Sequence, residues 1–206
     1  PLFDFTANDG VRHTGWRVAE GSTEGLRAAF AAVPCLYIAD GHHRAASASR
    51  TRAALRDANP RHTGDEEYNG FLAVIFPASQ LQILPYNRLV FDLAGRTPEQ
   101  VRSAVAEAFA VTPAESASPD RPGVVHMYLE GRWWRLEYRS DRGALSPVDC
   151  LDVSLLQSLV LAPILGIDDP RTSNRIDFVG GIRGTAELER RVDSGEAAVA
   201  FSMYPT

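Results

Sequence analysis

The chain has 206 residues, 45% hydrophobic and 23% charged, which suits one large or two small globular domains with their own cores. Acidic residues number 26 against 21 basic ones, a net charge of −5, so no nucleic-acid-binding surface is indicated. Every basic residue is arginine, which excludes a Walker A lysine, a Schiff-base lysine and a kinase-type ATP lysine within this sequence. Any bound anion must therefore be held by arginine, histidine or backbone amides.

The two cysteines, Cys35 and Cys150, have no CxxC spacing, which argues against a zinc site or a disulfide framework. A reduced, cytoplasmic setting is expected, with Cys35 inside a buried apolar run. No apolar run is long enough to cross a bilayer, so no membrane partner is expected. The sequence starts at Pro1 and enters a strand-like segment at once, which indicates a fragment of a longer protein.

The first part of the chain is predicted to alternate strands and helices. Ala-rich sequence without Gly or Pro, ended by Asn59-Pro60, favours one long helix, and a short continuous apolar run favours a buried strand. The predicted elements, in chain order, are a hairpin with strands 2–6 and 15–18, a helix at 22–32, a buried strand at 35–39, a helix at 42–58 and an exposed loop at 61–70.

The second part is predicted to contain an aromatic β-hairpin and further α/β elements. Thr97 and Pro98 indicate a helix start, and Trp133-Trp134 places one indole on each face of a strand. The predicted elements are strands at 71–76, 81–84 and 88–91, a helix at 98–109, hairpin strands at 124–129 and 133–138, a helix at 152–161, a strand at 176–179, a helix at 185–192 and a strand at 197–202.

Together these elements predict an α/β (mixed α+β) protein with a mixed sheet, flanking helices and an aromatic β-hairpin. Three regions are expected. Residues 1–111 form an α/β region, residues 112–123 a Pro- and Ser-rich linker or long loop, and residues 124–206 a hairpin plus α/β region packed on the first. A homo-oligomer is left open.

The most informative segment is Asp40-Gly41-His42-His43-Arg44, between the predicted strand 35–39 and the helix 42–58. Glycine allows a tight turn, and a helix start presents unpaired amides and the positive end of its dipole. Histidine and arginine in a first helical turn are unfavourable for that dipole, and a bound anion would remove the conflict. The turn is therefore predicted to bind phosphate through Gly41, His42, His43 and Arg44.

Asp40 has two interpretations that the sequence leaves open. Its carboxylate could cap the helix, or it could bind Mg²⁺ or accept a proton from a substrate hydroxyl. His42 and His43 could equally be surface residues, because adjacent helical side chains point about 100° apart and do not chelate one ion without a third ligand.

Three residues outside the turn are further candidates. Arg88, at a strand-like segment after Pro85, needs an anionic partner, either a substrate or an acid such as Asp92. Arg175 lies on one strand face with Asp177 and either binds an anion or forms an exposed ion pair. In the acidic loop, Glu66 or Glu67 could act as a base or metal ligand carried on a mobile loop, or these acids could simply be solvated.

Four segments resemble the domain-of-unknown-function family 1015: Pro1-Leu2-Phe3-Asp4-Phe5, Tyr37 to Arg44, Leu84-Pro85-Tyr86-Asn87-Arg88, and Arg175-Ile176-Asp177-Phe178-Val179-Gly180-Gly181. The resemblance spans nearly the whole chain. It implies no activity, since the family has none firmly assigned, and it implies that further sequence flanks this segment.

The Asp-Gly-His-His-Arg turn alone also resembles the nucleotide-binding turn of the ParB and sulfiredoxin-like superfamily, which includes a free-serine kinase. Gly41, His43 and Arg44 match the sulfiredoxin turn, but His42 replaces its catalytic cysteine, so sulfinic-acid reduction is excluded by this comparison. Only Gly41 and Arg44 match the ParB turn, which contacts CTP phosphates. The resemblance implies phosphate binding more than any one reaction.

These observations predict a protein that binds a nucleotide or phosphorylated small molecule and transfers a phosphoryl group, with Mg²⁺ and ATP, ADP or CTP as cofactors. Asp40, His43 and Glu66 are the candidate catalytic residues. Gly41, His42, His43, Arg44, Arg88 and Arg175 are the candidate phosphate-binding residues. The alternatives are a non-catalytic nucleotide-dependent switch and a metal-dependent hydrolase that uses Asp40, His42 and His62.

Overall fold

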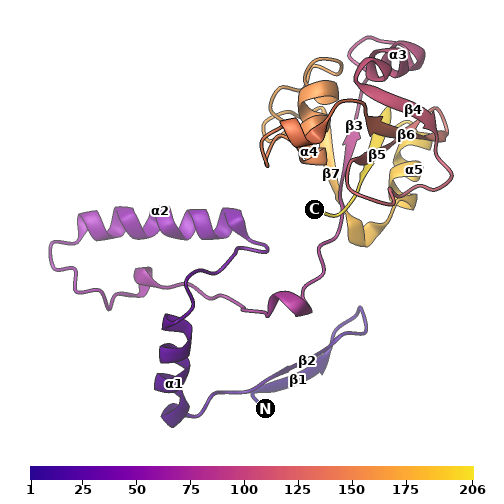
Figure 1. Ribbon diagram of the computed structural model, residues 1–206. Helices are drawn as coiled ribbons and strands as arrows, with labels where there is room; N and C mark the ends of the chain where they lie inside the picture. The colour runs from indigo at the N-terminus through magenta and orange to yellow at the C-terminus, as the bar shows by residue number, and fades with distance from the viewer. The chain divides into compact units, whose positions relative to one another are not determined.

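The computed structural model describes residues 1–206, which form two compact units, Pro1–Ile75 and Phe76–Thr206 (Figure 1). The class is mixed α+β, as predicted, with five α-helices, one two-stranded sheet and one six-stranded sheet. Each unit is described by itself below.

Pro1–Ile75 consists of local elements without a buried core. Its two strands pair antiparallel around a turn at Gly10, with Phe3 opposite Gly15. No side chain of this unit is buried, and several large apolar side chains are exposed, including Trp16 at 70% and Tyr37 at 91%. The elements are β1 (Phe3–Thr6), β2 (Arg12–Gly15), α1 (Glu20–Ala31), α2 (His42–Ala58) and the 3₁₀ turn η1 (Glu67–Asn69).

Phe76–Thr206 is built on a six-stranded antiparallel sheet of order β4-β6-β5-β8-β3-β7. Its strands are β3 (Tyr86–Val90), β4 (Phe109–Pro113), β5 (Val124–Leu129), β6 (Arg132–Tyr138), β7 (Ile176–Gly180) and β8 (Val199–Met203). Its helices are α3 (Pro98–Ala108), α4 (Asp152–Leu156) with the π-helical turn η4 (Gln157–Leu161), and α5 (Ala186–Asp193); the 3₁₀ turns are η2 (Ala78–Gln80), η3 (Arg142–Ala144) and η5 (Gly181–Arg183).

Helices cover both faces of this sheet. On one face, α3, α4 and η4 pack with the sheet around Phe201 and Met127, both fully buried. On the other face, Leu188 of α5 packs with Leu89 and Ala200. The central strand β8 contributes to both clusters because successive strand residues point to opposite faces.

Several predicted elements are confirmed nearly to the residue. The helix at 42–58 is α2, and the aromatic hairpin is β5 and β6. The start of α3 has a capping box: Gln100 N donates to Thr97 Oγ1 at 3.2 Å, and Thr97 N donates to Gln100 Oε1 at 2.9 Å. Pro98 occupies the first turn, as its missing N–H and fixed φ favour.

Other predicted strands are wrong. The apolar segments 35–39, 71–76 and 81–84 form no strand, and the second hairpin strand is Arg12–Gly15 rather than 15–18. A strand needs a hydrogen-bonding partner, and no ladder includes these apolar segments. Leu72 is therefore 92% exposed, and Cys35, expected in a core, is an exposed free thiol.

The predicted helix at 152–161 is only partly α-helical. It is α-helical only to Leu156, and the next five residues form a π-helical turn. Residues 112–123, expected as a linker or long loop, include the end of β4, and residues 114–123 form a loop that leads into β5 of the same sheet. None of the helices has the length and apolarity that crossing a membrane requires.

Candidate functional site

The turn at 40–44 leads into α2 through a left-handed glycine. Gly41 has φ +79°, a conformation that glycine adopts without steric cost. A Cβ at this position would lie 3.1 Å from an Arg44 guanidinium nitrogen, so a larger residue would be strained and crowded. The first intrahelical bond is from Ala45 N to Gly41 O, and no side chain caps the helix. The amides of His42, His43 and Arg44 are therefore free to bind a ligand.

The side chains of this turn are exposed, and all of them except that of Asp40 are basic. Asp40 does not cap the helix; its Oδ2 lies 3.5 Å from Arg44 Nη2, with both side chains more than 80% exposed. The His42 and His43 rings lie 4.0 Å apart, centroid to centroid, and the first turn of α2 holds no acidic residue. The positive end of this 17-residue helix thus has basic side chains and one weak carboxylate contact.

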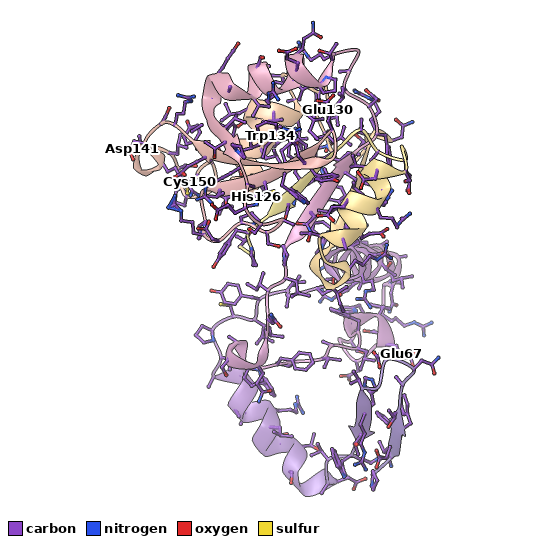
Figure 2. All side chains as sticks on the ribbon, turned by 90° about the vertical axis from the view of Figure 1, so that its right-hand side faces the viewer. Glu67, His126, Glu130, Trp134, Asp141 and Cys150 are labelled. Atoms are coloured by element: carbon purple, nitrogen blue, oxygen red, sulfur yellow. The ribbon has the colours of Figure 1, made fainter.

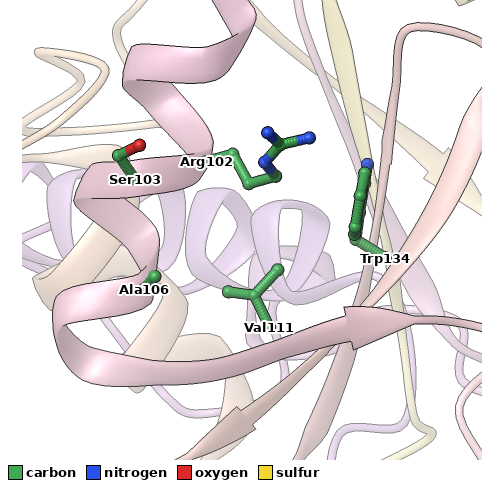
Figure 3. A pocket seen from close by; sticks show the side chains of 5 residues that line it. All are labelled: Arg102, Ser103, Ala106, Val111 and Trp134. Carbon is green, nitrogen blue, oxygen red and sulfur yellow. The ribbon is translucent and has the colours of Figure 1, made fainter.

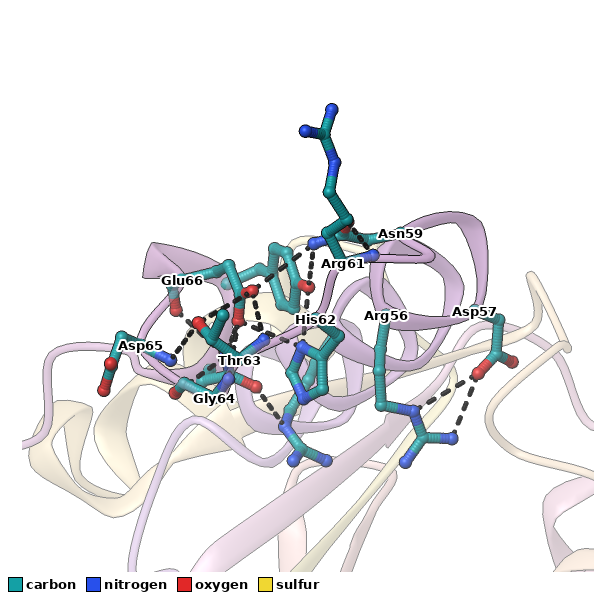
Figure 4. A network of polar contacts seen from close by, with 12 residues as sticks. Arg56, Asp57, Asn59, Arg61, His62, Thr63, Gly64, Asp65 and Glu66 are labelled. Atoms are coloured by element: carbon teal, nitrogen blue, oxygen red, sulfur yellow. Dashed lines mark hydrogen bonds and ion pairs between the residues drawn. The ribbon is translucent and has the colours of Figure 1, made fainter.

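Glu66 orders the loop that follows α2 (Figure 4). Its carboxylate accepts hydrogen bonds from Thr63 N at 2.7 Å and Gly64 N at 3.0 Å, and it lies 3.0 Å from His62 Nδ1. The Thr63 amide, with other backbone donors, lowers the pKa of Glu66 to about 2. Asn69 Nδ2 also donates to Glu66 Oε2, at 3.0 Å. A carboxylate with so many donors and such a low pKa is a weak base, and its geometry is that of a loop-ordering group.

Arg88, on β3 in the other unit, is a half-buried cation without a carboxylate partner. Its guanidinium lies 5.6 Å from the Tyr86 ring centroid and 5.4 Å from that of Phe178, and the two rings stack at 5.0 Å. Its one hydrogen bond is to the Tyr86 carbonyl oxygen. Burial lowers the pKa of Arg88 to about 10, so the side chain remains charged at neutral pH.

Replacing Arg88 with methionine is expected to raise the free energy of unfolding by about 1–2 kcal/mol, because the change removes an unpaired, partly desolvated charge and keeps the packing volume. The matched control is Arg175→Met, which should be neutral or lower stability by up to about 1 kcal/mol, since it breaks an ion pair. Urea denaturation of both variants provides the test. A larger loss of stability at Arg88 than at Arg175 would contradict the interpretation.

Arg175 forms an ion pair rather than facing an open site. Its Nε donates to Asp92 Oδ2 at 2.7 Å, and Nη2 contacts the other carboxylate oxygen. This bonding lowers the pKa of Asp92. Asp177 does not pair with Arg175; it accepts from Arg191 Nη1 at 2.7 Å. Both acids are therefore neutralised by arginines distant in sequence.

The candidate residues divide between the two units. The turn and Glu66 belong to Pro1–Ile75, and Arg88 and Arg175 belong to Phe76–Thr206. His62 lies with Tyr68, whose hydroxyl is 2.9 Å from its Nδ1, and with Glu66. No three or more His, Cys, Asp or Glu side chains gather as a metal site would require.

One cluster was not predicted from the sequence. Trp134 packs against the core, and in addition Arg102 of α3 and Arg132 of β6 both lie over its ring. The available signal was the spacing of Arg132 and Trp134, which places both on one face of a strand. No sequence signal indicates that Arg102 of α3 joins them, because its position over Trp134 depends on how the helix packs on the sheet.

The model of the family described as Protein of unknown function (DUF1015) matches residues 1–154. The chain belongs to this family. The match includes the turn at 40–44 and Arg88, whereas Arg175–Gly181, which also resembles the family, lies beyond the matched residues. No curated protein and no solved structure matches the chain. The likeness of the turn to the ParB and sulfiredoxin-like superfamily therefore stays a prediction.

Proposed function

We propose that this DUF1015 protein binds a nucleotide or another phosphorylated small molecule at the turn formed by Asp40 to Arg44. The observation that carries the proposal is the uncapped start of α2, where Gly41 is left-handed and the next three amides have no partner. Free amides at a helix N-terminus are donors for phosphate oxygens, and the helix dipole favours negative charge there.

The side chains of the turn supply further donors. His43 and Arg44 follow the glycine directly, and Arg44 can exchange its long, exposed contact with Asp40 for phosphate oxygens at small cost. The planar guanidinium can form two parallel hydrogen bonds to one phosphate. In a chain without lysine, arginine is the side chain that supplies this charge.

The proposal extends to a kinase-like activity, in which the bound nucleotide transfers a phosphoryl group to a small-molecule acceptor. Mg²⁺ bound with the nucleotide would neutralise phosphate charge, and Asp40 would orient the acceptor hydroxyl. A nucleotide-dependent binding module without chemistry is the second candidate. It is favoured by Glu66, whose carboxylate is engaged in ordering its own loop rather than available as a base.

Calorimetric titration of the full chain with ATP, ADP and CTP in the presence of Mg²⁺ tests the proposal. Wild-type protein should bind at least one of them, and adenosine, which has no phosphate, should not bind. Arg44→Ala and His43→Ala should each weaken binding about tenfold or more, because a hydrogen bond to a charged group contributes about 1.5–3 kcal/mol.

Arg56→Ala is the matched control, since Arg56 lies in the last turn of the same helix and its loss changes the net charge equally. Binding should survive that change. If no nucleotide binds, or if Arg56→Ala weakens binding as much as Arg44→Ala, the assignment of the turn is wrong. Incubation of the protein and a bound nucleotide with candidate acceptors then distinguishes phosphoryl transfer from simple nucleotide binding. A binding module forms no phosphorylated acceptor.

A further inference from the structure

A shallow hollow of about 340 Å³ lies between α3 and the β4–β6 edge of the sheet in Phe76–Thr206 (Figure 3). Its volume is at the lower end of the range for small-molecule sites. Polar and apolar groups face it together. The lining side chains are Arg102, Ser103, Ala106, Val111 and Trp134.

Two arginines lie over the Trp134 ring, and one of them, Arg102, also lines the hollow. The Arg102 guanidinium carbon lies 4.8 Å from the ring centroid, and that of Arg132 lies 5.7 Å from it. Arg132 precedes Trp134 by two residues on β6, so both side chains are on the same face of the strand. Two like charges are thus held near one aromatic ring.

Neither arginine has a partner that neutralises it. Arg102 and Arg132 make no ion pair and no side-chain hydrogen bond, whereas Arg135 on the opposite face of β6 pairs with Asp120 at 2.8 Å. Glu99 and Glu107 of α3 line a neighbouring hollow, which shares Ser103 with this one, and neither forms an ion pair with Arg102. In a chain with net charge −5, two unpaired cations over one aromatic ring are an arrangement that a bound anion would stabilise.

Stacking on tryptophan prepares a guanidinium for an anion. A guanidinium held over an aromatic ring keeps N–H donors that can bind oxygen atoms, and neither arginine uses its donors within the protein. Ser103 adds a hydroxyl at the rim of the hollow. Ala106 and Val111 provide an apolar wall, which an inorganic ion would leave uncovered.

We propose that this hollow binds a small organic oxyanion, a carboxylate or a phosphate ester. The guanidinium of Arg102, which lines the hollow, holds the oxyanion, and the organic body lies against Val111 and Ala106. The charge of Arg132, on the Trp134 ring, adds to the attraction. Trp134 positions both guanidiniums. The site lies entirely within Phe76–Thr206 and does not depend on phosphate binding at the Gly41 turn.

The indole N–H signals of the full chain report on this site by NMR. The chain has three tryptophans, and a Trp134→Phe variant assigns the signal of Trp134. We expect that millimolar phenyl phosphate or benzoate, at constant ionic strength, shifts this signal in a saturable way. Benzyl alcohol, which has the ring without the charge, should not do so. Comparison of the two anions identifies the preferred head group.

Arg102→Gln should raise the Kd of the anion about tenfold or more, because it removes a charged hydrogen-bond donor from the hollow. Arg132→Gln should raise it about two- to threefold through the lost charge, whereas Arg183→Gln should leave it unchanged. Arg183 is the matched control because it is exposed, belongs to the same unit and makes no ion pair. No saturable shift in the wild type with either anion overturns the proposal. An equal response to benzyl alcohol, or equal weakening by Arg183→Gln, also overturns it.

Discussion

Replacing Phe201 with alanine is expected to lower the free energy of unfolding of the Phe76–Thr206 unit by about 3–5 kcal/mol. Phe201 is fully buried on the central strand β8 and belongs to the core cluster under α3 and α4. It lies opposite Arg88 of β3 and Met127 of β5. Truncation there removes apolar burial and leaves a cavity that rigid neighbouring strands cannot close.

Guanidinium denaturation followed by tryptophan fluorescence measures this loss, since Trp133 and Trp134 lie in the same sheet. Ile182→Ala is the matched control, because Ile182 is apolar, belongs to the same unit and is 87% exposed. It should change stability by less than about 0.5 kcal/mol. A loss below about 1 kcal/mol at Phe201 would mean that this cluster does not hold the sheet together.

His126 is expected to make the stability of the same unit depend on pH. It lies on β5 and is 2% exposed, and neither of its ring nitrogens has a hydrogen-bond partner (Figure 2). Burial lowers the pKa of His126, and the nearby backbone of Ser116 opposes only part of that shift. The positive charge of Arg135 lowers the pKa of His126 further, and the negative charge of Asp120 opposes this lowering.

The direction of the pH effect follows from the lowered pKa. An unfolded histidine has a pKa of about 6.5 and binds protons more tightly than buried His126, so the unfolded state takes up more protons as the pH falls. The stability that the unit owes to keeping His126 neutral is therefore fully present above about pH 6.5 and is lost as the pH falls below that value.

His126→Leu is expected to raise the free energy of unfolding at pH 7 by about 1–3 kcal/mol, because an apolar side chain replaces an unsatisfied buried polar one. It should also flatten the stability profile between pH 7 and about pH 5. Denaturation at a series of pH values is the measurement. His43→Leu, a change in the other unit, is the control, and a profile of His126→Leu as steep as that of the wild type would contradict the prediction.

Local sequence signals were sufficient wherever an element depends on its own residues. The helix at 42–58 forms because it is rich in alanine and bounded by Gly41 and Asn59-Pro60. The cap of α3 needs only Thr97 and Gln100, three residues apart. The alternation of Trp133 and Trp134 placed them on opposite faces, where Trp133 Nε1 donates to Glu189 at 2.7 Å and Trp134 packs on the core.

Apolar runs led to wrong strand predictions, because an apolar composition does not specify which segment a strand would pair with. Residues 35–39 and 71–76 have the composition of buried strands, but no strand pairs with them and no layer covers them. The weaker-looking segment Tyr86–Val90 is a strand, since β7 and β8 hydrogen-bond to it on both sides. Pairing between distant segments decides such cases.

The sequence by itself determined the mixed α+β class, the family, the position of the Gly41 turn and the absence of lysine, which leaves arginine as the long cationic side chain of this protein. Only the tertiary structure decided which arginines are neutralised. Arg175 meets Asp92 from a distant segment, whereas Arg88 has no acidic partner and Arg102 and Arg132 meet at one tryptophan. Charge pairing and burial depend on the distances between residues that are far apart in the sequence. Folding sets these distances, and the spacing of residues along the chain does not reveal them.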